Sequence, residues 1–142
     1  MAHSTIPQQL VDSYAKTIYR IDTFPEPVYL RIDTFSAPLA LLLQDTNSRH
    51  AAIVSAYNPF SRPLPIEENL TAHRSLRHCL QHQGYSIVEG SNIDPCAQWP
   101  AEKSFFVSGI DPDTAQFIGR QFNQNAIVRI GADAVPRLLL LR

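Results

Sequence analysis

The stretch I-V-S-A-Y-N-P-F-S-R-P-L-P-I-E-E-N at residues 53–69 decides how the rest of the chain is arranged. Its start belongs to an apolar run over residues 51–56, which is short and bounded by turn residues, as in a central strand buried on both faces. A proline-rich loop follows, and a helix is predicted over residues 66–83, with Gly84 suited to its C-terminal cap. Side chains at this junction of strand, loop and helix are therefore the first candidates for a site.

The segments before this stretch alternate between helical and extended patterns. Apolar residues three and four apart predict an amphipathic helix over residues 6–18, with an extended segment over residues 17–23 as an alternative. Apolar and polar residues alternate over residues 28–34, which predicts a half-exposed strand. Good helix formers after a proline predict a short buried helix over residues 38–44.

The segments after it continue the alternation. Strands are predicted over residues 85–89, 103–109 and 126–130, and residues 137–141 are either a last strand or a contact with a partner. The run Asp111-Pro112-Asp113 predicts a helix that buries Ala115, Ile118 and Phe122. Residues 103–130 have the size of a right-handed parallel crossover. We therefore predict one α/β domain over residues 1–142, a single mixed sheet of about five to six strands flanked by three to four helices.

Composition limits the classes of function. Hydrophobic residues make up 44% and charged residues 18% of the 142 residues, which is typical of a globular protein. The formal net charge of -1 disfavours a nucleic acid partner. The sequence shows no signal peptide and no membrane span, so we expect a cytoplasmic protein without a membrane partner. Cys79 and Cys96 are too few for a disulfide framework and lack zinc-site spacing.

Polar residues on the long predicted helix raise two alternatives. A helical projection places Asn69 and His73 in the apolar sector, where polar groups must find partners. Asn69 either caps the loop around Asn58, with His73 as a core histidine, or offers an amide edge to a ligand. His78 and His82 fall on the opposite, solvated side, and without an H-E-x-x-H pattern we expect no metal site.

Ser61 and Arg62 precede the same helix, where the backbone N–H groups and the helix dipole favour an anion. The alternative is a solvent-facing arginine. The chain contains neither G-x-x-x-x-G-K nor G-x-G-x-x-G, so we expect no cofactor bound by a phosphate loop or a dinucleotide fold.

Polar residues also stand next to three predicted strands. Glu102 comes just before one strand, Gln124 and Asn125 come just before another, and Asn58 follows residues 51–56. These side chains can meet only if the strand at residues 51–56 runs antiparallel to the other two. An all-parallel sheet would place them at opposite edges.

Three motifs carry a resemblance. A-Y-N-P at residues 56–59 with Ser61 and Asn69, W-x-x-E-x-S at residues 99–104 and F-x-Q-N-A-I at residues 122–127 resemble the hallmarks of bacterial domain-of-unknown-function family 3293. Tyr14, Thr17 and Tyr19 fit its N-terminal pattern. Asn123 stands where the resemblance implies a glycine. The resemblance implies a compact α/β domain and supplies no activity.

Two functions follow as hypotheses. The first is a small-molecule domain that binds or processes a nucleotide-like or phosphorylated ligand, with Glu102 as a general base. Its other candidate residues are Tyr57, Asn58, Ser61, Arg62, Asn69, Trp99, Ser104, Gln124 and Asn125. The second is a non-enzymatic interaction or structural module, in which the leucine run at residues 138–141 forms a homo-oligomer. Whether the chain is an enzyme is not decided by its sequence.

Overall fold

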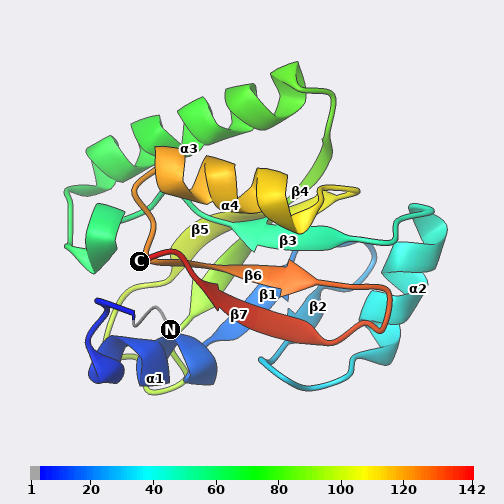
Figure 1. The fold of residues 1–142 in the computed structure, drawn as a ribbon, viewed down its shortest axis with the longest axis horizontal. Helices are drawn as coiled ribbons and strands as arrows, with labels where there is room; N and C mark the ends of the chain where they lie inside the picture. The colour runs from blue at the N-terminus through cyan, green and yellow to red at the C-terminus, as the bar shows by residue number, and fades with distance from the viewer. Residues whose placement is uncertain (1–3) are drawn as a thin grey trace.

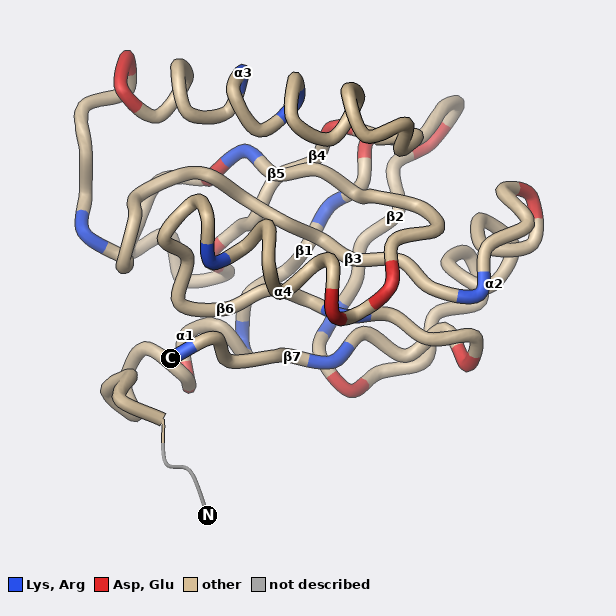
Figure 2. Tube along the Cα trace, turned by 45° about the horizontal axis from the view of Figure 1, so that its top comes forward, with Lys and Arg blue, Asp and Glu red and all other residues tan. Residues whose placement is uncertain are grey.

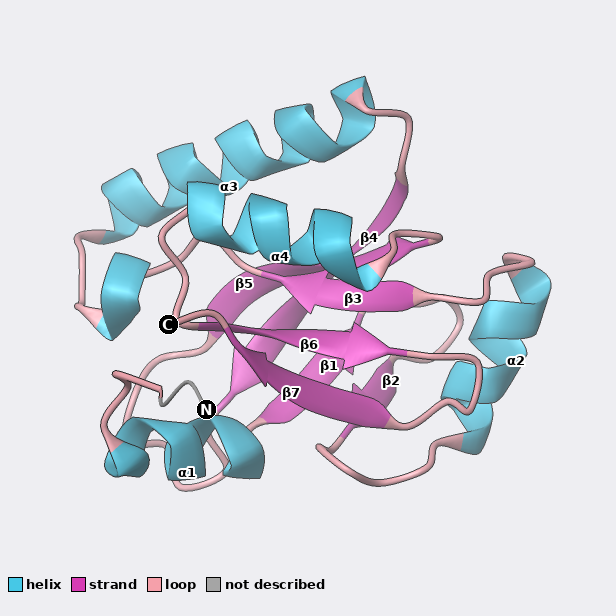
Figure 3. Ribbon diagram, in the orientation of Figure 1, coloured by secondary structure: helices cyan, strands magenta, loops and turns pink. Residues whose placement is uncertain are grey.

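Four helices and one sheet of seven strands make up the computed structural model, which describes residues 4–142 (Figure 1, Figure 3). In chain order the elements are α1 (Gln8–Lys16), β1 (Ile18–Ile21), β2 (Val28–Leu30), α2 (Ala37–Asp45), β3 (Ala51–Val54), a 3-10 turn (Pro59–Ser61), α3 (Ile66–His82), β4 (Ser86–Ile93), β5 (Glu102–Ser108), α4 (Pro112–Gln121), β6 (Ala126–Ile130) and β7 (Pro136–Leu140). The predicted α/β class is confirmed.

The strands follow the order β2-β1-β4-β5-β3-β6-β7, and every neighbouring pair is antiparallel. The prediction of a mixed sheet with five to six strands is therefore wrong in both respects. β5 and β6 do run in the same direction, but β3 lies between them and pairs with both. The parallel crossover predicted over residues 103–130 does not form, because the helix connects two strands that are not neighbours.

Element boundaries differ from the predictions where polar residues lie in strands. α1 ends at Lys16 and β1 begins at Ile18, which confirms the extended alternative for the segment after the first helix. β4 continues to Ile93, well beyond the predicted end at residue 89, because it pairs with β1 and β5 along this part. β2 ends at Leu30, earlier than predicted, and in α2 only Leu39 and Leu43 are buried.

Each face of the sheet has its own hydrophobic core. On one face, α3 and α4 pack through Leu76, Leu80 and Ile118 onto strand residues such as Phe105. On the other face, α2 packs against β2 and contributes Leu39 and Leu43 to a second core that includes Phe106. Figure 1 shows α3 and α4 on one side of the sheet and α1 on the other. The space under α1 lies on the same face as the second core.

The sheet curls until its two edge strands approach each other. The backbone N–H of Asp33, after β2, donates to the carbonyl oxygen of Pro136 in β7 at 2.7 Å. A second bond runs from the N–H of Ser36 to the carbonyl oxygen of Ala134 at 3.1 Å. These contacts hold the sheet in a half-closed shape, concave on the side of α1.

Two helices end in the same left-handed turn. Gly84 follows α3 with φ +88°, and its N–H and that of Tyr85 donate back to the last carbonyls of the helix. Asn123 does the same after α4 with φ 57°, and its turn directs the next residue, Gln124, toward β3. Asparagine is among the few residues other than glycine that adopt this conformation readily, so Asn123 can serve where the resemblance implies glycine.

Basic and acidic residues are interspersed over the fold rather than gathered on one face (Figure 2). Within residues 4–142, no helix combines the length and the apolar character that a bilayer crossing requires.

Substituting Gly90→Ala should test the β1–β4 pairing. A Cβ at this position would lie 2.0 Å from the backbone carbonyl oxygen of Arg20, which cannot move without breaking the ladder. We expect the free energy of unfolding in urea to fall by about 1–3 kcal/mol or more. Gly131→Ala is the matched control, because its Cβ would make only an ordinary contact at 3.7 Å with Asp133. Equal stability of the two variants would contradict the prediction.

Candidate functional site

A cavity of about 200 Å³ lies between α1 and the concave face of the sheet. Apolar side chains of β3, β6 and β7 form its floor, namely Ile53, Val128 and Leu138. α1 covers it with Leu10, Ser13 and Tyr14. Polar side chains from three segments of the chain stand in its wall, namely Asn58, Glu102 and Gln124. The cavity thus has an apolar body and a polar end.

The polar end exists because of strand direction. β3 runs antiparallel to β5 and β6, so the residue after β3 and the residues that begin the other two strands reach the same edge of the sheet. The antiparallel direction on which the predicted meeting of these side chains depends is therefore confirmed. Asn58, Glu102 and Gln124 therefore all line one cavity.

Asn58 is the centre of this polar group. Its backbone is left-handed, with φ 46° and ψ 67°, a conformation that asparagine tolerates. Its Nδ2 donates to Oε2 of Glu102 at 2.8 Å. Its Oδ1 accepts from the N–H of Leu64 at 2.9 Å and from Nδ2 of Asn69 at 2.8 Å. The loop after β3 is thereby tied to both α3 and β5.

Asn69 braces the loop and does not line the cavity. It is 3% exposed, and its Oδ1 accepts from the backbone N–H of Asn58 at 2.9 Å while its Nδ2 donates to Asn58 Oδ1. Both ends of its amide are engaged by the loop. This placement corresponds to the capping alternative for Asn69.

Gln124 joins the end of α4 to the end of β3. Its Nε2 donates to the carbonyl oxygens of Tyr57 at 3.1 Å and of Phe122 at 3.2 Å. The backbone N–H of Phe60 adds a third link by donating to the carbonyl oxygen of Asn123 at 2.8 Å. The two loops at the polar end of the cavity therefore hold each other in place.

Asn125 attaches α1 to the same region. It is 5% exposed, and its Nδ2 donates to the hydroxyl oxygens of Tyr14 at 2.9 Å and Ser61 at 3.2 Å. Tyr14 and Ser61 also share a hydrogen bond. The Oδ1 of Asn125 accepts from Arg142 at 3.0 Å. All polar atoms of the Asn125 side chain are used in this network, which holds the cover of the cavity.

Glu102 is a half-buried carboxylate that forms no ion pair within residues 4–142. Burial raises its pKa above the ordinary value, and the hydrogen bond from Asn58 only partly opposes this shift. Burial and the neighbouring Glu102 also raise the pKa of Tyr57. The cavity wall therefore disfavours negative charge on both groups.

The remaining predicted site residues divide between the cavity and other places. Trp99 and Ser61 line it. Ser104 is buried in β5 at 1% exposure without lining it, and Arg62 is exposed outside it. The structure thus brings together seven of the predicted residues, namely Tyr57, Asn58, Ser61, Trp99, Glu102, Gln124 and Asn125, and leaves out Arg62, Asn69 and Ser104.

The histidines that the structure describes stand apart from the cavity. His78 and His82 are exposed on α3 with ring centroids 5.9 Å apart, and the part of the chain that the structure describes holds no group of three or more side chains able to bind a metal. His73 is buried, stacks on Phe105 with centroids 4.2 Å apart, and contacts Oε1 of Glu89 through Nε2 at 2.6 Å.

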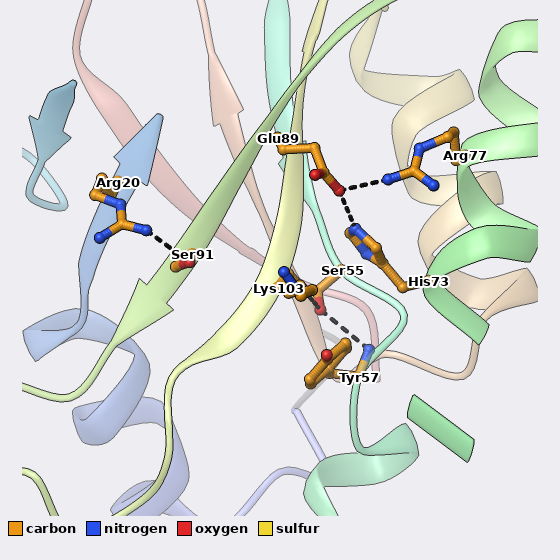
Figure 4. Close-up of polar contacts among 8 residues, drawn as sticks. All are labelled: Arg20, Ser55, Tyr57, His73, Arg77, Glu89, Ser91 and Lys103. Carbon is orange, nitrogen blue, oxygen red and sulfur yellow. Dashed lines mark hydrogen bonds and ion pairs between the residues drawn. The ribbon is translucent and has the colours of Figure 1, made fainter. Parts of the chain in front are cut away.

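Glu89 lies between His73 and Arg77, as Figure 4 shows. Burial lowers the pKa of His73, and the bond to Glu89 opposes that shift. The Nδ1 of His73 is buried without a partner among the described residues, so protonating it would bury an unpaired donor. His73 is accordingly a neutral core histidine, and the edge of Tyr57 packs against its ring at 6.0 Å between centroids.

Several lining residues were not among the predicted site residues. Tyr14, Thr17 and Tyr19 line the cavity, and only the resemblance pointed to them. Ser13 and Asn92 also line it. Asn92 pairs directly with Glu102 across β4 and β5. A strand predicted over the full length of β4 would have placed these two residues opposite each other.

Asn69→Ala should destabilise the domain even though alanine favours helix. The substitution removes the acceptor for the Asn58 N–H and one donor to its Oδ1. We expect the free energy of unfolding to fall by about 1–3 kcal/mol. Ser75→Ala is the control, because Ser75 is exposed on the same helix. A loss no larger than that of the control would contradict the bracing role.

Glu102→Gln should change how stability depends on pH. The folded-state pKa of Glu102 lies above its ordinary value of 4.5, so ionising it costs stability as pH rises through and above that value, whereas below it both states are protonated. Glutamine removes this cost and can still accept from Asn58. We expect the unfolding free energy of the variant to gain on that of the original chain as pH rises above 4.5, measured by urea denaturation. Glu26→Gln, at an exposed position, is the control, and equal trends in the two variants would refute the prediction.

The chain matches one family model, described as "Protein of unknown function (DUF3293)", over residues 54–127, which is just over half of its length. This segment contains the polar end of the cavity, from Tyr57 to Asn125, while α1 and β1 lie outside it. No curated protein and no solved structure matches the chain.

Proposed function

We propose that this chain, which belongs to the DUF3293 family of proteins of unknown function, is a small-molecule binding domain whose ligand occupies the cavity under α1. The observation that carries the proposal is the convergence of Asn58, Glu102 and Gln124 on one space from three distant segments. A largely apolar cavity with a few convergent polar groups and a carboxyl group of raised pKa has the general form of a ligand site.

The size of the cavity limits the ligand. An apolar cavity of about 150 Å³ can hold one benzene molecule, so about 200 Å³ suits one substituted ring or a body of similar size. The ring of the expected nucleotide-like ligand agrees with this size. Its phosphoryl group would find no Lys, Arg or His among the described lining residues and would have to lie outside, where Arg62 is exposed.

Processing of the ligand would depend on Glu102. It is the one carboxylic acid in the described lining, and a raised pKa brings a carboxyl group closer to the range in which it can exchange protons at neutral pH. If the ligand is transformed here, Glu102 is the general base that we propose.

The alternative function, an interaction module acting through residues 138–141, stays a prediction. β7 is an edge strand of the sheet, but its outer side is already partly used, because the carbonyl oxygen of Pro136 accepts from the N–H of Asp33. Three of the four leucines at residues 138–141 are also used within the domain, because Leu138 lines the cavity and Leu139 and Leu141 pack in the core under α4. These contacts favour the cavity as the functional feature.

A thermal-shift screen tests the proposal. The full chain would be melted with nucleobases, nucleosides, sugars, sugar phosphates, amines and guanidines, and we expect at least one class to raise the melting temperature. A ligand at 100 times its Kd adds about 2.7 kcal/mol of stability. No shift from any class would refute the proposal.

A cavity-filling variant tests whether the ligand binds in the cavity under α1. Ser13→Phe places a ring in the cavity from α1, and we expect it to abolish the shift. Gln9→Phe is the matched control, because Gln9 is exposed on the same helix and should keep the shift. An equal shift in both variants would place the ligand elsewhere and overturn the proposal.

A further inference from the structure

Charge is the first feature that narrows the ligand class. The described lining contains one carboxylate, Glu102, and no Lys, Arg or His. Glu102 is half-buried, accepts one hydrogen bond from a neutral amide and has no ionic partner in the described chain. Carboxylates removed from water are normally paired with a positive group. In this cavity the missing positive group can come from the ligand.

The hydrogen bonds of the lining residues also favour a positively charged ligand. Gln124 uses its Nε2 for the carbonyl oxygens of Tyr57 and Phe122, and no donor among residues 4–142 bonds its Oε1. The Oε1 of Glu102 likewise accepts from no donor in the described chain, because the bond from Asn58 goes to Oε2. The lining therefore holds two side chains with oxygens that lack donors. A ligand rich in N–H groups would satisfy them.

Aromatic rings are the third feature of the lining that favours a cation. Tyr14, Tyr19, Tyr57 and Trp99 all line the cavity. The faces of such rings attract ammonium and guanidinium groups, and a cluster of them beside a carboxylate is the usual chemistry of organic-cation recognition. An anionic ligand would instead meet Glu102 with no lining cation to offset the repulsion.

We infer that the cavity selects a small organic cation, whose ammonium or guanidinium group pairs with Glu102 while its apolar or planar body lies among the aromatic rings. This inference rests on the proposed function and narrows it to one charge class. Bound cation would also favour the ionised form of Glu102, whose pKa burial otherwise raises.

Isothermal titration with matched probes tests the inference. Benzamidine and benzamide have nearly the same shape and differ in charge, and benzoate supplies the opposite charge. We expect benzamidine to bind about tenfold to a hundredfold more tightly than benzamide at neutral pH, as for a hydrogen bond to a charged group. Benzoate should bind no better than benzamide.

Glu102→Gln should remove that preference by weakening benzamidine alone, and Glu26→Gln, at an exposed position, should preserve it. The comparison of probes on the unaltered chain stands even if the variant does not fold. Equal or tighter binding of benzamide or benzoate would overturn the cation inference and leave the proposed function intact. If none of the probes binds and no compound in the thermal-shift screen raises the melting temperature, the cation inference and the proposed function are both overturned.

Discussion

The direction of β3 between β5 and β6 is the constraint on which the rest of the structure depends. Because β3 runs against both neighbours, the end of one strand and the beginnings of two others meet at one edge of the sheet. A carboxylate and two amides that are far apart in the sequence then share one small volume. With β3 reversed, Asn58 would lie at the opposite edge, about 13 Å away for a strand of four residues.

The polar residues near this edge divide into those that brace and those that line. Asn69 and Asn125 have all their side-chain groups engaged within the protein, so they fix loops and helices. Glu102 and Gln124 each keep an oxygen without a donor in residues 4–142. Asn58 links the two sets. Fixed loops and unsatisfied oxygens together are what a preorganised binding site requires, because the ligand need not order the groups that contact it.

Features set by local chemistry could be predicted from the sequence. The cap at Asp111 forms as expected, with its side chain accepting from the N–H of Thr114 at 2.8 Å, and β6 has the predicted bounds. The inward positions of Asn69 and His73 followed from helix geometry and are confirmed by their burial. The direction and order of strands could not be predicted, because periodicity within a strand carries no information about its neighbours.

There is also a physical reason why Asn92 was not predicted as a site residue. The second half of β4 contains Ser91 and Asn92, whose polar character broke the apolar pattern by which strands were recognised. Asn92 is polar where it lines the cavity. Local rules are expected to fail at positions whose chemistry serves a site. The polar residue that interrupts the apolar pattern of this strand is thus also a residue that lines the cavity.

α1 contributes no fully buried residue, although it covers the cavity. A helix with so little buried surface adds little to the cooperative stability of the sheet and can open at lower free energy than the core strands. The hydrogen bond from Asn125 to Tyr14 is one of the contacts that hold it over the cavity. A ligand bound under α1, as proposed, would therefore also stabilise the order of the first helix.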